Sequence, residues 1–418
     1  YNVNDSAFLS FKLTKNKLGK GSFGSVYVGK TKKGFIAVKC EANNKKAESL
    51  TLYKEYMICR TFYLIINYLG LINSVSHLKD KIKDDDGDKT QIKINNDIRK
   101  KITKKEDEIA NIVSSDEIKI FEYITSNNML SIPKSMKIDF LLNYKCVPCI
   151  LRYMECENHN FLLMELCGDN LDSFLLKYMF TETGKYFIAF HLINTISCIH
   201  RCGVVHRDIK MSNIVLNKQI DNTNIDNNIN KNIPDTDIYP IILDMGLSKK
   251  YYKINSEKFI KLSVKKNNDI VGTLRYISIN IHEHNSPTVI DDLISLSYVL
   301  VSIFTGKDLP WMGHKKDISK FEPSKHKLDN CKCGYHRNVK NNCTKGNNTI
   351  AEMKFHTSLE VLTGKYVFLA KWIKYLYSLK ANQLPSYNYL FDELNKEICD
   401  FKKKNNIDEL LFEYKKNN

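Results

Sequence analysis

The fold of this 418-residue chain can be predicted from one stretch, His206-Arg207-Asp208-Ile209-Lys210-Met211-Ser212-Asn213. Phosphoryl transfer to a hydroxyl group needs a carboxylate that orients the hydroxyl and accepts its proton, and an oxygen ligand for the Mg²⁺ ion on the phosphate chain. Asp208 suits the first role and Asn213 the second. Lys210 lies between them and suits contact with the transferred phosphate. The apolar run at 214–216 then predicts a short buried strand.

A glycine-rich stretch near the N-terminus, Gly19-Lys20-Gly21-Ser22-Phe23-Gly24, predicts a phosphate-binding loop. In a dinucleotide-binding fold such a motif opens a helix. Here residues 11–17 alternate as a strand does, and the β-branched and aromatic residues 26–28 predict a second strand after the glycines. Strand, glycine loop and strand let backbone N–H groups approach nucleotide phosphates without an intervening Cβ. Phe23 is expected at the tip of this loop.

The next strand, Phe35-Ile36-Ala37-Val38-Lys39, ends in a lysine that we expect to hold the α- and β-phosphates. A helix over residues 50–62 should follow, because apolar residues recur there at helical spacing. That helix carries Glu55, the favoured partner for Lys39. Glu48, just before the helix, is the alternative.

A hinge and a metal site are predicted further along the chain. The apolar run at 161–166 ends in Cys167-Gly168, and the backbone groups of Glu165 and Cys167 should bond the adenine edge, with Met164 behind it. A strand at 241–243 leads into Asp244-Met245-Gly246. This is D-F-G with Met in place of Phe, so Asp244 is the expected bridging Mg²⁺ ligand.

These segments define the candidate site. The predicted catalytic residues are Asp208, Lys210 and Lys39, and the predicted metal ligands are Asn213 and Asp244. The predicted ATP-binding set is Gly19, Lys20, Gly21, Ser22, Phe23, Gly24, Val26, Ala37, Lys39, Glu55, Met164, Glu165, Cys167, Asn213 and Asp244.

Supporting contacts are also predicted. Thr273 is expected to hydrogen-bond Asp208 and Lys210, and Asp292 to accept bonds from the backbone of the catalytic loop. Asn170 or Asp169 should cap a helix. His191 and His200, on a long helix at 187–200, are interpreted as surface or packing residues rather than ligands.

Three stretches interrupt the pattern. Residues 67–143 are Lys- and Asn-rich, with one amphipathic helix through Ile98, Ile102, Ile109 and Ile112, and are interpreted as a solvated insertion. A docking or regulatory element is the alternative. Residues 219–237 are low in complexity and are expected to be a disordered loop that splits two strands.

The third insertion, residues 314–348, has a possible zinc-binding set. Three thiols and an imidazole are a complete Zn²⁺ ligand set by type. The spacing matches no common zinc finger, so a disordered insert is favoured over a metal site. The four residues are Cys331, Cys333, His336 and Cys343.

Composition limits the other possibilities. The chain is 43% hydrophobic, enough for two lobes with cores, and its 12 cysteines are spread singly, as in a reducing compartment. A cytoplasmic or nuclear location is therefore expected. No apolar run of about 18 residues occurs, so no membrane span is predicted. Residue 1 is Tyr rather than Met, so targeting signals cannot be assessed.

The formal net charge of +16 has two interpretations. It favours an acidic partner such as a phosphorylated protein, nucleic acid or anionic lipid. Alternatively, it follows from a Lys-rich composition whose charge lies largely in the insertions. The second interpretation is preferred, because beyond net charge no recognised module supports nucleic-acid binding.

Taken together, these residues resemble the eukaryotic protein kinase family. The C-terminal half is similar to the casein kinase 1 group, which has a Ser-Ile-Asn signature in place of the usual A-P-E. The closest stretch is Gly272-Thr273-Leu274-Arg275-Tyr276-Ile277-Ser278-Ile279-Asn280. Residues 247–251, 291–300, 309–311, 358–362 and 384–390 are similar too. The resemblance extends from about residue 15 to 396, apart from the insertions.

The sequence differs from the casein kinase 1 pattern in two places, and both bear on which subgroup it resembles. Members of the group place two arginines before the Asp291-Asp292 pair, where they help to bind a phosphate on the substrate, and here Val289 and Ile290 stand there. Lys249, Lys250 and Arg275 are possible substitutes. Met245 makes the chain similar to the vaccinia-related kinases, the second candidate subgroup, although that subgroup usually lacks the arginine found at 207.

The resemblance implies a bilobal α+β fold, with a small antiparallel β lobe plus one helix (1–166) and a mainly helical large lobe (167–418). It implies a monomeric Ser/Thr protein kinase that uses ATP and Mg²⁺ and is active without activation-segment phosphorylation. A pseudokinase scaffold is the alternative from another class.

Overall fold

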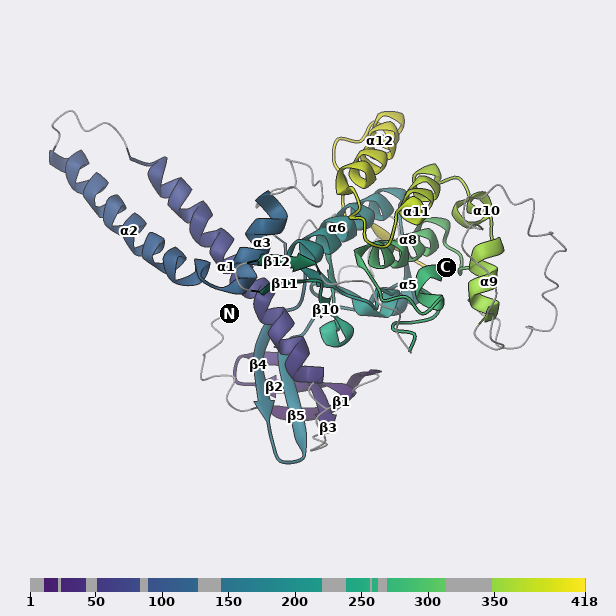
Figure 1. Ribbon diagram of the computed structural model, residues 1–418, viewed down its shortest axis with the longest axis horizontal. Helices are drawn as coiled ribbons and strands as arrows, with labels where there is room; N and C mark the ends of the chain where they lie inside the picture. Colours follow the sequence, from purple (N-terminus) through teal and green to yellow (C-terminus); the bar gives the residue numbers. More distant parts are fainter. Residues whose placement is uncertain are drawn as a thin grey trace.

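The computed structural model describes residues 11–21, 24–42, 51–82, 89–126, 144–219, 238–255, 258–261, 269–312 and 348–417. Figure 1 shows a sheet crossed by one long helix, beside a larger and mainly helical part. The predicted bilobal α+β architecture is therefore confirmed.

The small lobe is built on a five-stranded antiparallel sheet. Its order is β1 (Lys12–Gly21), β2 (Gly24–Thr31), β3 (Gly34–Ala42), β5 (His159–Glu165) and β4 (Ile150–Glu155). Successive side chains of a strand point to opposite faces. In β3, Ile36 and Val38 therefore join a small apolar cluster on one face. Ala37 and Lys39 turn to the other face, toward α1.

Three helices follow β3: α1 (Thr51–Lys79), α2 (Lys89–Val113) and α3 (Asp116–Ser126). α1 runs 17 residues past its predicted end at 62 and pairs with α2 in a projecting hairpin (Figure 1). Of all described helices, α1 alone is long and apolar enough to cross a membrane by length and composition. Half of its apolar window is buried within the protein, however, and it carries the buried Glu55.

The amphipathic helix predicted within 67–143 is α2. The solvated character predicted for this stretch does not hold for α3, which buries Ile118, Ile120, Phe121 and Ile124. Residues 127–143 lie outside the described residues.

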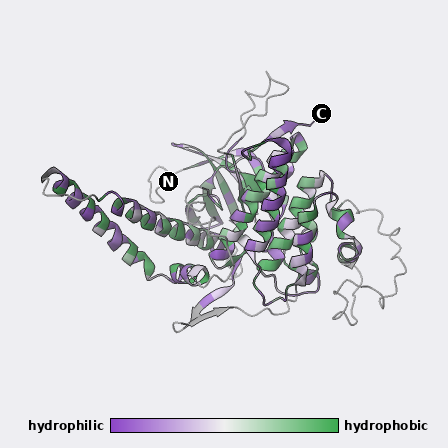
Figure 2. Cartoon of the chain, turned by 90° about the horizontal axis from the view of Figure 1, so that it is seen from above, coloured by the Kyte–Doolittle hydropathy of each residue, from purple (hydrophilic) through white to green (hydrophobic). Residues whose placement is uncertain are grey.

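The large lobe is centred on α6 (Glu182–Arg201) and α8 (Val289–Thr305). α8 is apolar on nearly all sides and buried along most of its length, as expected for a central core helix. Figure 2 shows hydrophobic ribbon concentrated where these helices pack together. The remaining helices are α5 (Leu171–Lys177), α7 (Ile279–His282), α9 (Asn348–His356), α10 (Leu359–Thr363), α11 (Val367–Ser378) and α12 (Tyr387–Asn405).

Short antiparallel pairs join the loops of this lobe. They are β6 (Tyr178–Phe180) with β13 (Tyr414–Lys416), β7 (Val204–Val205) with β10 (Lys249–Lys250), β8 (Ile214–Leu216) with β9 (Pro240–Ile242), and β11 (Tyr252–Asn255) with β12 (Lys258–Lys261). Two 3₁₀ turns, η3 (Met211–Asn213) and η5 (Met245–Leu247), carry candidate site residues.

We expect the low-complexity stretch between β8 and β9 to be dispensable for folding. The Asn217 N–H donates to the Tyr239 carbonyl at 2.9 Å, and the Tyr239 N–H to Asn217 Oδ1 at 3.0 Å, so the strand ends are already close. Replacing residues 220–237, which lie outside the described residues, with a four-residue turn should shift the thermal midpoint by no more than about 3 °C. Calorimetry would measure this, and loss of folding would contradict it.

Candidate active site

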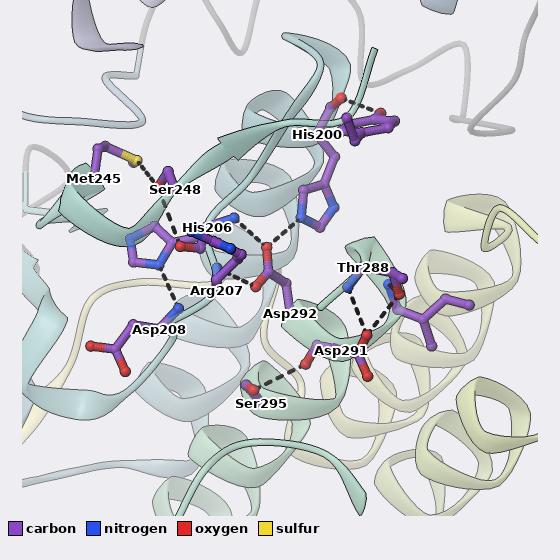
Figure 3. Close-up of polar contacts among 12 residues, drawn as sticks. His200, His206, Arg207, Asp208, Met245, Ser248, Thr288, Asp291, Asp292 and Ser295 are labelled. Atoms are coloured by element: carbon purple, nitrogen blue, oxygen red, sulfur yellow. Dashed lines mark hydrogen bonds and ion pairs between the residues drawn. The ribbon is translucent and has the colours of Figure 1, made fainter. Parts of the chain in front are cut away.

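The catalytic loop leaves β7 and is held from below by α8 (Figure 3). Asp292 accepts hydrogen bonds from the backbone N–H groups of His206 (2.6 Å) and Arg207 (2.8 Å), as predicted. Arg207 has a φ of 72°, in the left-handed region that non-glycine residues rarely adopt. The buried Asp292 carboxylate therefore stabilises a strained turn directly before Asp208.

His206 links this loop to the strand that precedes Asp244. Its Nδ1 accepts from the Asp208 N–H at 3.2 Å, so its Nε2, 2.9 Å from the Leu243 carbonyl, must carry the proton. The Leu243 N–H in turn donates to the Asn213 carbonyl at 2.7 Å. These contacts bring the backbones around Asp208, Asn213 and Asp244 together.

His200 also supports the loop, which sequence reasoning missed. It is fully buried, and its Nε2 lies 3.0 Å from Asp292 Oδ2 (Figure 3). Its Nδ1 contacts the Tyr387 hydroxyl. His191 is buried among Phe187, Tyr144 and Tyr239. Of the two interpretations offered for these histidines, the surface position is wrong and the packing position is correct.

The Asp208 carboxylate is fixed on both oxygens. Oδ1 accepts from Thr273 Oγ1 at 2.7 Å, and Oδ2 lies 2.8 Å from Lys210 Nζ. Asn213 Nδ2 donates to the same Oδ2 at 3.2 Å and to the Asp208 carbonyl at 2.9 Å. Lys210 Nζ also donates to Thr273 Oγ1 at 3.0 Å, so both contacts predicted for Thr273 are present.

A second charged cluster lies where the two lobes meet. Lys39 Nζ is 2.7 Å from Glu55 Oε2 and 2.8 Å from Asp244 Oδ1, which joins β3, α1 and η5. The predicted Lys39–Glu55 pair is thus present, whereas Glu48 lies outside the described residues. Lys39 and Glu55 are 5% and 3% exposed, but the Asp244 side chain is 30% exposed. Asp244 is therefore the member that can reach a ligand.

The pKa directions follow from this difference in burial. Burial opposes the charged form of Lys39, but the Glu55 and Asp244 carboxylates outweigh it and raise the lysine pKa. Burial dominates at Glu55 and raises its pKa, although Lys39 counteracts it. At Asp244, burial is outweighed by Lys39, which lowers the pKa. The cluster thus keeps an ionised aspartate beside a permanent cation.

The glycine-rich stretch is the turn between β1 and β2. Gly21 pairs with Gly24, and Gly19 with Val26. A Cβ on Gly24 would lie 2.2 Å from the Cys40 carbonyl oxygen, so only glycine fits this close approach. Ser22 and Phe23, together with the side chain of Lys20, lie outside the described residues.

The predicted hinge follows β5. Ala37 pairs with Met164 across β3 and β5, and both side chains are buried on the face that Val26 also packs against. The Glu165 carboxylate accepts from the Cys149 N–H at 2.7 Å and from Lys145 Nζ at 2.6 Å. After Cys167, the Gly168 N–H donates to the Leu216 carbonyl at 2.8 Å, which ties this segment to β8.

A cavity of about 340 Å³ lies beside the catalytic loop. Lys210 and Thr273, which both contact Asp208, belong to its wall, so it opens next to the proposed base. Arg275 is exposed at this wall. The complete lining is Asp172, Lys210, Met211, Ser212, Thr273, Arg275, Tyr276, Ser302, Asp308 and Met312.

The fold and the site together define a phosphotransferase of the two-lobed type. The chain matches the family description "Protein kinase domain" over residues 74–363, more than half of its length. It therefore belongs to the protein kinase family. The matched segment contains the catalytic loop, Asp244 and Thr273. The glycine-rich turn, Lys39 and Glu55 precede it, and the fold brings Lys39 and Glu55 to Asp244.

Residues that would hold a metal ion fit this family. Asn213 uses its amide nitrogen toward Asp208, which leaves the amide oxygen as the available ligand atom. Asp244 supplies a carboxylate. Within the described ranges, no group of three or more His, Cys, Asp and Glu side chains is arranged around a common point. The zinc candidates Cys331, Cys333, His336 and Cys343 lie outside those ranges.

Sequence reasoning also missed α3 as a support for α1. The α3 helix contacts the α1 helix through Tyr68 and Glu122, whose side chains hydrogen-bond. On its other side, Phe121 packs against the Arg201 guanidinium at 5.4 Å, and Glu117 pairs with Lys250 at 2.9 Å. α3 therefore connects the helix that carries Glu55 to both α6 and β10. The signal was its apolar spacing at 118, 121 and 124.

We expect Phe121→Ala to loosen α1. Deleting a buried phenylalanine typically costs about 3–5 kcal/mol, and here the lost contacts are those between α3 and α6. Amide hydrogen exchange should accelerate in α1 and α3 more than in α8. The matched control is Ile94→Ala, at a 46% exposed position on α2. Equal acceleration throughout the protein would show that α3 has no specific role in holding α1.

Proposed function

We propose that this protein kinase transfers the γ-phosphate of ATP to serine or threonine hydroxyls of protein substrates, and that it is similar to the casein kinase 1 group. The observation that carries the proposal is the Asp208 carboxylate, held by Thr273, Lys210 and Asn213 beside an open cavity. This geometry suits a base that orients a hydroxyl group.

In this proposal each charged group has one task. Asp208 orients the acceptor hydroxyl and takes its proton, and Lys210 stabilises negative charge on the transferred phosphate. Lys39, fixed by Glu55, stabilises the phosphate chain. Asp244 and Asn213 hold Mg²⁺, which when bound neutralises the phosphate oxygens. The glycine-rich turn and the hinge at Glu165 and Cys167 bind the phosphates and the adenine.

The serine/threonine assignment is supported by the segment Gly272 to Asn280, which resembles the casein kinase 1 signature. The contacts of the described residues also show which basic side chains could bind an acidic group on the substrate. Val289 and Ile290 are buried at the start of α8, and Lys250 is paired with Glu117. Arg275, exposed at the cavity, is the cation best placed for an acidic substrate group.

A reducing compartment is proposed for this kinase. No disulfide joins the nine cysteines among the described residues, and six of them are buried as small apolar groups.

The test is transfer of the γ-phosphate from Mg-ATP to casein, followed by identification of the phosphorylated amino acid. Phosphoserine or phosphothreonine supports the proposal. Phosphotyrosine alone would overturn the specificity. A folded protein that binds ATP but transfers nothing would favour the scaffold alternative, against which the intact Lys39, Asp208 and Asp244 contacts argue.

A further inference from the structure

Lys354 of α9 is a buried lysine that the proposed chemistry does not use. The residue is only 6% exposed. Its Nζ donates to the Leu274 carbonyl at 2.7 Å and to the Ile277 carbonyl at 2.6 Å. His282 Nε2 lies 3.2 Å away. In the part of the chain that the structure describes, no carboxylate forms an ion pair with this ammonium group. Burial lowers the pKa of Lys354.

Aromatic rings complete the surroundings of this lysine. Its Nζ lies 5.4 Å from the ring centroids of both Tyr298 and Trp311, a distance suited to cation–π attraction. Trp311 is itself bonded to the same loop, because its Nε1–H donates to the Arg275 carbonyl at 2.7 Å. Two side chains thus bind three carbonyls of the loop formed by residues 272–277.

The opposite side of this loop contacts the catalytic loop. Thr273 is bonded to Asp208 and Lys210. Gly272 has a φ of +102°, and a Cβ there would lie 2.6 Å from the Arg207 carbonyl oxygen. Thr273, Arg275 and Tyr276 also form part of the cavity wall. The loop therefore lies between the catalytic aspartate on one side and the Lys354–Trp311 pair on the other.

We propose that Lys354, together with Trp311, is a positioning residue for the protein substrate. By holding the carbonyls of Leu274, Arg275 and Ile277, the pair fixes the cavity wall that places the acceptor hydroxyl against Asp208. The proposal rests on the function proposed above and deepens it. Lys354 itself touches neither the nucleotide nor the acceptor. A buried lysine without a carboxylate partner is costly, and anchoring this loop is a role that accounts for it.

The first test compares Lys354→Met with wild type. Hydrogen bonds that involve a charged group are worth enough to change a rate by about tenfold or more. We expect kcat/KM for casein to fall at least tenfold, while KM for ATP and the slow transfer of phosphate to water stay within about twofold. Lys371→Met is the matched control, because Lys371 is an exposed lysine paired with Glu393 on neighbouring helices.

Trp311→Phe is the second variant and decides the question if Lys354→Met does not fold. It keeps an aromatic face but removes the indole N–H that binds the Arg275 carbonyl. We expect a loss of about threefold or more in kcat/KM for casein, again with an unchanged KM for ATP. The proposal would be overturned if the rates of phosphate transfer to casein and to water fell equally. It would also be overturned if kcat/KM for casein were unchanged in both variants.

A third measurement separates this proposal from the proposed function. If wild type phosphorylates no serine or threonine, that function fails, and amide hydrogen exchange decides the role of Lys354. The N–H groups of Tyr276 and Ile277, which donate to the Thr273 carbonyl, should then exchange faster in both variants than in wild type. Unchanged exchange at these amides would show that Lys354 and Trp311 do not hold the loop.

Discussion

Asp208→Asn is expected to reduce kcat for phosphate transfer by at least about 100-fold, with little change in nucleotide affinity. The two side chains have the same shape, and the remaining amide oxygen can still accept from Thr273. The variant removes the proton acceptor and the ion pair with Lys210, which lies 2.8 Å from Oδ2 in the wild type. Steady-state transfer to casein and titration with a non-hydrolysable ATP analogue would measure the two quantities separately.

The control for this experiment is Asp392→Asn, the same chemical change at an exposed position on α12. It should retain full activity. Transfer by Asp208→Asn within about threefold of wild type would mean that Asp208 is not the base, because a positioned acid–base group typically contributes 10²-fold or more.

The catalytic loop was predictable because its chemistry is local in sequence. Asp208, Lys210 and Asn213 lie within six residues, so the motif itself specifies their proximity. The contacts of Thr273 and Asp292 could be predicted only because these residues belong to a recognisable segment. Glu55 was predicted from helical periodicity, and its pairing with Lys39 at 2.7 Å agrees with that prediction.

The length of α1 could not be predicted from local signals. Helical spacing of apolar residues predicted an end at residue 62, and Gly70 lies beyond it, where a glycine within a helix costs about 1 kcal/mol relative to alanine. Burial of Ile65, Leu69 and Val75 along the same helix outweighs that cost. Tertiary packing of an apolar face commonly decides where a helix ends.

Lys354 and His200 were missed for a different reason. Each is a polar residue whose partners lie far away in sequence: Leu274 and Ile277 for Lys354, Asp292 for His200. A lone lysine or histidine on a helix is usually exposed, and no local pattern distinguishes one that tertiary packing will bury. Such buried polar contacts become visible only when the fold is known.

Substitution of Lys39, the buried lysine of the small lobe, is expected to have large effects on both activity and stability. Lys39→Met is expected to reduce kcat for phosphate transfer by at least about 100-fold, because a preorganised positive charge beside the phosphates is lost. It should also lower the free energy of unfolding by about 3 kcal/mol, because Glu55 is left buried without its partner. Chemical denaturation monitored by tryptophan fluorescence would give the stability, and the casein assay the activity.

A double variant separates these two losses. The double variant Lys39→Met/Glu55→Leu removes the buried ion pair that joins β3 to α1, and apolar replacement of a buried ion pair is often neutral or stabilising. We expect stability within about 1 kcal/mol of wild type while transfer stays abolished. Lys79→Met is the control, because it breaks the exposed Lys79–Glu106 pair and should cost less than about 1 kcal/mol. A double variant as unstable as Lys39→Met would mean that the lost stability does not come from leaving Glu55 buried without its partner. Recovered activity in the double variant would mean that Lys39 is not needed for phosphate transfer.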